Sequence, residues 1–161
     1  PKDIRWHLIG HLQTNKVKYV VPFVHLIHSI DSENLLEEIN KQAGKINRGI
    51  SILLQIHIAH EESKFGFSTE EADKVIQLCR NGKFKNVRID GLMGMATNTE
   101  DQTQVRTEFR GLKHFFDQVR QPETLNPKLV TLSMGMSSDW EIAIQEGSTM
   151  VRIGSSIFGS R

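Results

Sequence analysis

The 161-residue sequence contains few cysteines, tyrosines and tryptophans and carries almost no net charge. Its single cysteine excludes a disulfide within the chain and is typical of a reducing compartment, so we expect a cytoplasmic protein. The 20 basic and 19 acidic residues leave a net charge of +1, which gives no electrostatic reason to expect nucleic acid or an anionic membrane as a partner. No apolar run approaches the roughly 20 residues of a membrane span.

Several common catalytic and binding signatures are also missing. The sequence has no G-x-x-x-x-G-K-[ST] phosphate loop, no G-x-S-x-G elbow and no H-E-x-x-H zinc motif. Two histidine pairs, His25 with His28 and His57 with His60, have a spacing that on a strand directs their side chains to opposite faces. We therefore expect hydrogen-bonded histidines there rather than metal ligands. Cys79 falls on the packed face of an expected helix, and we interpret it as structural.

Apolar runs alternate with amphipathic segments along the chain. Strands are expected near residues 6–10, 24–30, 50–58, 87–95, 129–134 and 149–153, and helices near 13–18, 31–44, 69–80, 100–120 and 138–146. This alternation predicts βαβ units around a parallel sheet, hence an α/β fold. Periodicity does not choose between an open doubly wound sheet and a (β/α)8 barrel.

Two serines have the spacing of a capping box. Ser68 precedes Glu71 by three residues and Ser138 precedes Glu141 by three, so a helix is expected to start at each serine. The second of these helices is expected to run to residue 146, with Gly147 as its left-handed stop.

The most distinctive stretch is residues 131–159, TLSMGMSSDWEIAIQEGSTMVRIGSSIFG. Both of its expected strands end in glycine and serine, and a helix begins beside them. Such an arrangement offers free backbone N–H groups and the positive end of a helix dipole, which suits a phosphate. We expect a phosphate to be held, mostly through backbone N–H groups, by Ser133, the Met134 main chain, Ser137, Gly154 and Ser155.

Arg152 lies in the second of these strands. Alternation places its side chain on the same face as Gly154, between the apolar residues Val151 and Ile153. A buried guanidinium needs an acceptor, which is either an acid of this chain or an acceptor atom on a ligand. Both interpretations stay open at this point, and in the first the two strand ends are ordinary turns.

Two long motifs carry a resemblance to a known family. Residues 132–159 resemble the C-terminal signature of the pyridoxal-phosphate homeostasis proteins, and residues 6–16, WHLIGHLQTNK, resemble that family's aromatic-His-x-Ile-Gly-x-Leu-Gln-x-Asn-Lys pattern. The shorter runs HSID, SKFG and GLM, at residues 28–31, 63–66 and 91–93, fall in the family's order. The resemblance covers essentially the whole chain. It implies a (β/α)8 barrel of the alanine racemase N-terminal type, of which this chain supplies about strands three to eight.

The resemblance also implies a ligand and a role. The ligand is pyridoxal 5′-phosphate (PLP), and the role is intracellular vitamin B6 homeostasis, as a carrier or buffer that serves PLP-requiring apo-enzymes. With PLP bound, Arg152 is expected to face the pyridine nitrogen. Because an arginine only donates hydrogen bonds, that nitrogen must stay an unprotonated acceptor, which makes the ring a weak electron sink.

The family holds PLP as a Schiff base on a lysine at the end of its first strand, and no lysine here lies in a matching position. We therefore interpret residues 1–161 as one PLP-binding barrel domain without its N-terminal part. Its open sheet edges are expected to favour self-association, whereas the full-length protein is expected to be a monomer. Lys64 follows the longest strand and is a candidate for phosphate contact or transient PLP attachment, although a solvated loop lysine is the simpler expectation. Lys16 is expected at the surface.

Two enzymatic alternatives remain. A racemase-like enzyme would need a second acid/base on the opposite face of the cofactor, which in alanine racemase is a tyrosine from another domain of the partner subunit. This sequence has one tyrosine, Tyr19, in an early loop, which favours the non-enzyme. A phosphate-binding barrel enzyme of another chemistry would need carboxylates at several strand ends, and only Asp31 and Asp90 are plausible.

Overall fold

The computed structural model describes residues 3–59, 65–120 and 129–159, and within these ranges six parallel strands form one sheet. The strands are β1 (His7–Leu8), β2 (Leu26–Ile30), β3 (Ile50–Ile56), β4 (Val87–Gly94), β5 (Thr131–Met136) and β6 (Met150–Arg152). The helices are η1 (Thr14–Lys16), α1 (Val17–Val20), α2 (Glu33–Lys45), α3 (Thr69–Arg80), α4 (Gln102–Arg120), α5 (Trp140–Gln145) and α6 (Ser155–Phe158). Strands and helices alternate, so the expected α/β fold is confirmed. None of the described helices combines the length and the apolar character needed to cross a membrane.

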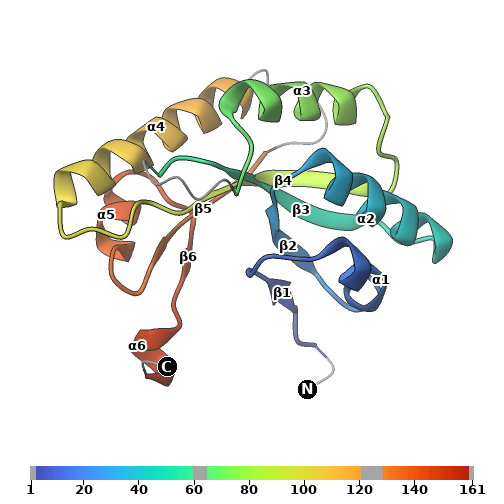
Figure 1. The fold of residues 1–161 in the computed structure, drawn as a ribbon, viewed down its shortest axis with the longest axis horizontal. Coiled ribbons are helices and arrows are strands. Elements are labelled where there is room, and N and C mark those ends of the chain that lie inside the picture. The colour runs from blue at the N-terminus through green and yellow to red at the C-terminus, as the bar shows by residue number, and fades with distance from the viewer. Residues whose placement is uncertain (1–2, 60–64, 121–128, 160–161) are drawn as a thin grey trace.

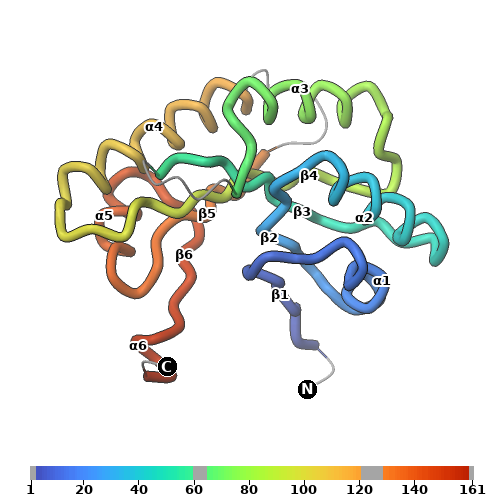
Figure 2. The backbone as a smooth tube through the Cα atoms, viewed as in Figure 1, coloured from blue at the N-terminus to red at the C-terminus, as the bar shows by residue number. Residues whose placement is uncertain are grey.

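The strands lie in the sheet in the same order as in the sequence, with β1 and β6 at its two edges. The sheet curls into an open arch, and α2, α3, α4 and α5 lie around its outer side (Figure 1). The backbone trace shows both ends of the chain on the same side of the molecule (Figure 2). A doubly wound sheet would carry helices on both faces, so the arrangement is an incomplete (β/α)8 barrel, as the resemblance implied.

The two faces of the sheet bury different side chains. The large apolar core lies between the sheet and the helices, and it includes Ile27, Ile52, Leu92, Leu132 and Met134 from the strands and Leu36, Ile76, Phe109 and Phe116 from the helices. Among the residues that the structure describes, the inner face holds a small apolar cluster, of Leu26, Leu53 and Met93 with Met150 packed against it. Because side chains alternate along a strand, the inner face also receives the buried polar residues His28, Ser133 and Arg152.

One of the two expected capping boxes is present. Ser68 Oγ accepts the Glu71 N–H at 3.2 Å, and the Glu71 carboxylate accepts the Ser68 N–H at 2.9 Å. The box expected at Ser138 is wrong, because α5 begins at Trp140 with Asp139 as its N-cap residue and no side-chain cap. The Asp139 carboxylate instead accepts the Met136 N–H at 2.6 Å and closes the turn that follows β5. This turn moves the N-cap from Ser138 to Asp139 and delays the helix by one residue.

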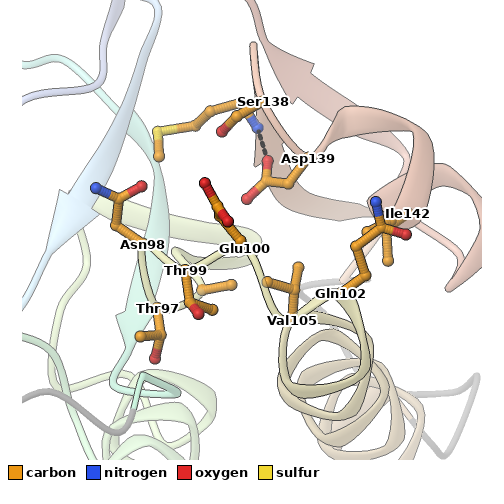
Figure 3. Close-up of a pocket in the computed structure, with 11 residues that line it drawn as sticks. Thr97, Asn98, Thr99, Glu100, Gln102, Val105, Ser138, Asp139 and Ile142 are labelled. Carbon is orange, nitrogen blue, oxygen red and sulfur yellow. Dashed lines mark hydrogen bonds between the residues drawn. The ribbon is translucent and has the colours of Figure 1, made fainter.

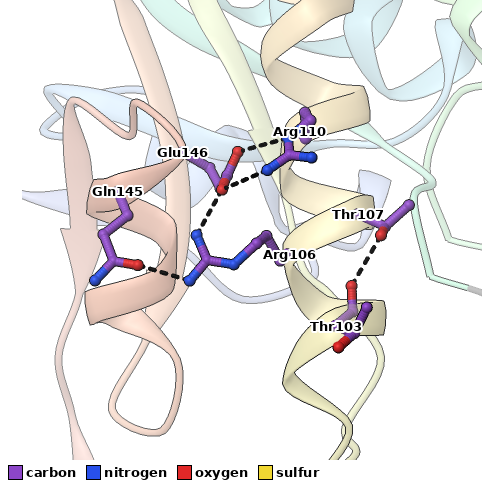
Figure 4. A network of polar contacts seen from close by, with 6 residues as sticks. All are labelled: Thr103, Arg106, Thr107, Arg110, Gln145 and Glu146. Carbon is purple, nitrogen blue, oxygen red and sulfur yellow. Dashed lines mark hydrogen bonds and ion pairs between the residues drawn. The ribbon is translucent and has the colours of Figure 1, made fainter.

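Helix α5 is fixed to α4 by an ion-pair network (Figure 4). Glu146, the C-cap residue of α5, accepts from Arg106 at 2.6 Å and from Arg110 at 3.0 Å. Hydrogen bonds from Arg110 and Arg106 lower the pKa of the Glu146 carboxyl. Gly147 follows with a φ of +94° and ends the helix as expected. The network holds α5, and with it the turn after β5, in a defined position.

Candidate functional site

A pocket of about 460 Å³ lies where the strands end. It is lined by Ile9, Gly10, Met95, Met136, Ser137, Ser138, Arg152, Ile153, Gly154 and Ser155. These residues follow or end β1, β4, β5 and β6, so both edges of the sheet contribute to one pocket. Ligand sites of α/β barrels are built at this carboxyl end of the strands.

The structure brings together most of the residues expected to bind a ligand. Ser137, Arg152, Gly154 and Ser155 all line the pocket. Ser133 and Met134 do not line it, and both are fully buried. The Met134 side chain packs in the core under the helices, and its carbonyl oxygen accepts a hydrogen bond from Ser148 Oγ at 2.8 Å. A role for these two residues in contacting a phosphate therefore stays a prediction.

Backbone amides converge beside Ser137. Ser137 Oγ accepts the N–H of Gly154 at 3.2 Å and the N–H of Ser156 at 3.4 Å. The second amide belongs to α6, a short helix that the sequence did not predict, because Gly-Ser-Ser indicated only a turn. Two N–H groups aimed at one oxygen form a site in which an anion oxygen can replace the hydroxyl.

Arg152 supplies a positive charge to the same pocket. Its Nη1 donates to Ser133 O at 2.9 Å and to Ser133 Oγ at 2.8 Å, and its Nη2 donates to Gly94 O at 3.0 Å. Among the described residues no carboxylate forms an ion pair with it, so the partner here is a set of neutral oxygens rather than an acid. Burial lowers the pKa of Arg152 to about 10, which leaves the guanidinium charged at neutral pH.

Apolar side chains form the remaining walls of the pocket. Ile9, Met95, Met136 and Ile153 surround the polar groups, and each lies just beyond or at the end of a strand. Sequence reasoning did not single these residues out. The signal that could have found them is their common position at or just after the end of a strand. That position indicates a shared site only when the order of the strands in the sheet is known. Together they offer a surface on which a flat aromatic ring can lie.

A larger cavity of about 640 Å³ lies next to this pocket, between the N-terminal end of α4 and the turn before α5 (Figure 3). Its charged lining residues are Glu100 and Asp139, and no basic residue is among those that line it in the described part of the chain. Two carboxylates repel a phosphate group, whereas Arg152 attracts one. The smaller pocket is therefore the better candidate for a phosphate-bearing ligand.

Several other candidates from the sequence lie away from the pocket. Tyr19 is 62% exposed on α1, and Lys16 is exposed on η1, as expected. Lys64 and His60 lie outside the described residues. Cys79 packs against the core, and burial raises the pKa of its thiol to about 12, in agreement with a structural role.

The two candidate carboxylates are paired with neighbours. Asp31 lies 3.0 Å from the His11 ring nitrogen, and Asp90 accepts from Arg88 at 2.5 Å. Neither is among the residues lining the pocket. The alternative of a phosphate-binding barrel enzyme of another chemistry therefore has neither of its two candidate carboxylates in this pocket.

Comparisons with known proteins agree with this geometry. The family model of the alanine racemase N-terminal domain matches residues 3–161. The pyridoxal phosphate homeostasis protein of Aquifex aeolicus is 42% identical over 159 residues, which make up 99% of this chain and 68% of that protein. The chain belongs to the pyridoxal phosphate homeostasis family. It spans about two thirds of the length of the curated relatives it matches, including the Helicobacter pylori member, which is 36% identical and of which it covers 67%.

Solved structures of related proteins have the same fold as this chain. PipY of Synechococcus elongatus, solved with PLP bound, superposes with a TM-score of 0.84 at 32% identity, covering 98% of this chain and 71% of PipY. An alanine racemase of Clostridium difficile superposes with a TM-score of 0.73 at 12% identity, covering 98% of this chain and 40% of the racemase. This second likeness shows the fold alone, and it confirms the racemase-type barrel.

Proposed function

We propose that this member of the homeostasis family binds PLP in the pocket between β1 and β6. The observation that carries the proposal is the convergence of the Gly154 and Ser156 amides on Ser137, next to a buried Arg152 that forms no direct ion pair among the described residues. Ser137, Gly154 and Ser155 hold the phosphate, and Arg152 faces the ring nitrogen. The apolar walls cover the ring, and Ser133 supports Arg152 from behind.

The same arrangement favours a carrier or buffer over a catalyst. PLP supplies an electrophilic carbon and an electron sink, and the strength of that sink depends on protonation of its ring nitrogen. Arg152 has only donor groups and stays charged below about pH 10, so it holds that nitrogen as an unprotonated acceptor. A racemase-like reaction would also need a second acid/base, and the chain's one tyrosine, Tyr19, does not line the pocket. Transfer of PLP to apo-enzymes and a monomeric full-length protein stay predictions.

Titration of this chain with PLP tests the proposal. We expect saturable binding, followed by the absorbance of the cofactor, and binding of pyridoxal, which lacks the phosphate, to be at least about tenfold weaker. The reason is that each charge-assisted hydrogen bond to a phosphate contributes about 1.5–3 kcal/mol. Matched variants sharpen the result: Ser137→Asp places a carboxylate on the amides and should abolish the preference for PLP, whereas the neutral Ser137→Asn should retain it. Equal affinity for PLP and pyridoxal would contradict the phosphate site.

The binding is expected to be non-covalent. No lysine lines the pocket among the described residues, so no amine is in place to bond to the PLP aldehyde. Borohydride reduction of the saturated complex should therefore leave no stoichiometric pyridoxyl-lysine in the mass spectrum. Full labelling of a single residue, Lys64 for example, would overturn this part of the proposal while leaving the phosphate site intact.

A further inference from the structure

A chain of hydrogen bonds runs from Arg152 across the inner face of the sheet. Arg152 Nη1 lies 2.8 Å from Ser133 Oγ, which in turn lies 3.1 Å from His28 Nδ1. His28 Nε2 lies 3.1 Å from His7 Nδ1. The four residues come from β6, β5, β2 and β1, so the bonds join the two edges of the sheet. Ser133 and His28 are both fully buried.

The direction of each bond follows from the chemistry of the groups. A guanidinium has no acceptor, so Arg152 donates and Ser133 Oγ accepts. A buried hydroxyl also needs an acceptor for its own proton, and His28 Nδ1 is the one acceptor bonded to it among the described residues. His28 must then be neutral with its proton on Nε2, from where it donates to His7 Nδ1.

The electrostatics of the inner face agree with this order. Burial, together with the nearby His7 and Arg152, lowers the pKa of His28 to about 4. Burial and the nearby His25 lower the pKa of His7 as well, and the His25 ring stacks on the His7 ring at 5.7 Å. At neutral pH the four groups carry one positive charge, on Arg152. Each hydrogen bond of the chain is donated in the direction that leads away from Arg152.

We propose that His28 is a positioning residue for the PLP site, because it accepts the hydrogen bond of the Ser133 hydroxyl and so leaves a lone pair of the Ser133 oxygen directed at Arg152. Without this acceptor the hydroxyl hydrogen is free to rotate toward Arg152, which weakens that bond, and the two carbonyl oxygens, Ser133 O and Gly94 O, stay as the fixed partners of Arg152. The assignment deepens the proposed function and rests on it, since Arg152 is the group that faces the ring. It also gives a reason for burying His28, which does not line the phosphate pocket and belongs to no potential metal-binding group among the described residues.

The tautomer of His28 is the first test, and it needs no cofactor. Nitrogen-15 NMR of the chain at pH 7 should show His28 Nδ1 unprotonated and Nε2 protonated, with the resonances assigned by their loss in His28→Asn. A proton on Nδ1, or a doubly protonated ring, would overturn the proposal because Ser133 could not then donate to it.

Two substitutions separate positioning from simple packing. His28→Leu removes the acceptor, and we expect PLP binding about three- to tenfold weaker, the loss of one neutral hydrogen bond. His28→Asn places an amide oxygen close to the position of Nδ1 and should restore affinity to within about twofold of the parent chain. His114→Leu, on the exposed face of α4, is the matched control and should leave affinity unchanged. Equal affinities for the leucine and asparagine variants at position 28 would overturn the positioning role.

Coupling to Ser133 completes the test. If His28 acts through Ser133, the double variant His28→Leu/Ser133→Ala should bind PLP no more weakly than Ser133→Ala alone, whereas multiplied effects would contradict the proposal. Failure of the parent chain to bind PLP would instead overturn the proposed function. The role of His28 would then be tested by NMR of the Arg152 guanidinium group. We expect separate N–H resonances, which indicate hindered rotation, in the parent and in His28→Asn, and a single averaged resonance in His28→Leu. Identical spectra in all three would remove the positioning role.

Discussion

Replacing Arg152 by leucine is expected to weaken PLP binding about ten- to hundredfold, because one charge-assisted hydrogen bond to the ring contributes about 1.5–3 kcal/mol. The change also leaves Ser133 O, Ser133 Oγ and Gly94 O without their buried donor. The free energy of unfolding should therefore fall by about 1–3 kcal/mol as well. Cofactor titration and urea unfolding of the same preparation measure the two effects separately.

Arg152→Glu distinguishes a contact with the ring from a general effect of charge. A carboxylate at this position can accept a proton held on the ring nitrogen, so the absorbance spectrum of bound PLP should shift toward that of the protonated ring. The neutral Arg152→Gln is the matched control, and it should weaken binding without this shift. A folded Arg152→Glu chain with an unchanged spectrum and an unchanged affinity would show that Arg152 does not face the ring.

Replacing Gly91 by alanine is expected to cost at least about 3 kcal/mol of stability and to prevent much of the chain from folding. Gly91 pairs with Thr131 between β4 and β5, and a Cβ atom on it would lie 1.7 Å from Thr131 O. The atoms in the way all belong to the Thr131 backbone, so the strands must separate or the register must change. The same strand ends at Gly94, whose carbonyl holds Arg152, and PLP binding should be lost together with the fold. Circular dichroism and urea unfolding measure the effect.

Gly111 provides the matched control for this substitution. It lies on the exposed side of α4, and a Cβ atom there would meet nothing within 4 Å. Gly111→Ala should therefore raise stability by about 0.5–1 kcal/mol through higher helix propensity. A Gly91→Ala chain that unfolds at the same urea concentration as Gly111→Ala would contradict the close approach of β4 and β5.

Much of the fold could be predicted from periodicity. The apolar run at residues 50–58 predicted a strand, and β3 lies between β2 and β4 with only Ser51 less than fully buried. The curl of the sheet was not available from periodicity, because inner and outer residues alternate in the same way in flat and curled sheets. The resemblance supplied it. The predicted start of α5 was wrong because the Asp139 carboxylate accepts the Met136 N–H and closes a turn before the helix. The spacing of Ser138 and Glu141 carries no information about that hydrogen bond.

The site could be predicted in part. Alternation placed the Arg152 side chain on the same face as Gly154, but depth along a strand depends on register. Between β5 and β6 the register shifts, since Ser133 pairs with Met150 while Met136 pairs with Arg152. Ser133 therefore lies in the interior and not at the strand end. For His28 the sequence predicted only a hydrogen-bonded histidine, because its partner Ser133 lies 105 positions away and no local pattern reports that contact.

The most direct test of the central claim is a map of the backbone amides of this chain during titration with PLP. Nitrogen-15 correlation spectra should show the largest shifts at Gly154, Ser155 and Ser156, where the amides converge beside Ser137, and much smaller shifts there with pyridoxal. Shifts concentrated instead at residues 97–102, in the acidic cavity beside α4, would contradict the assignment of the phosphate site.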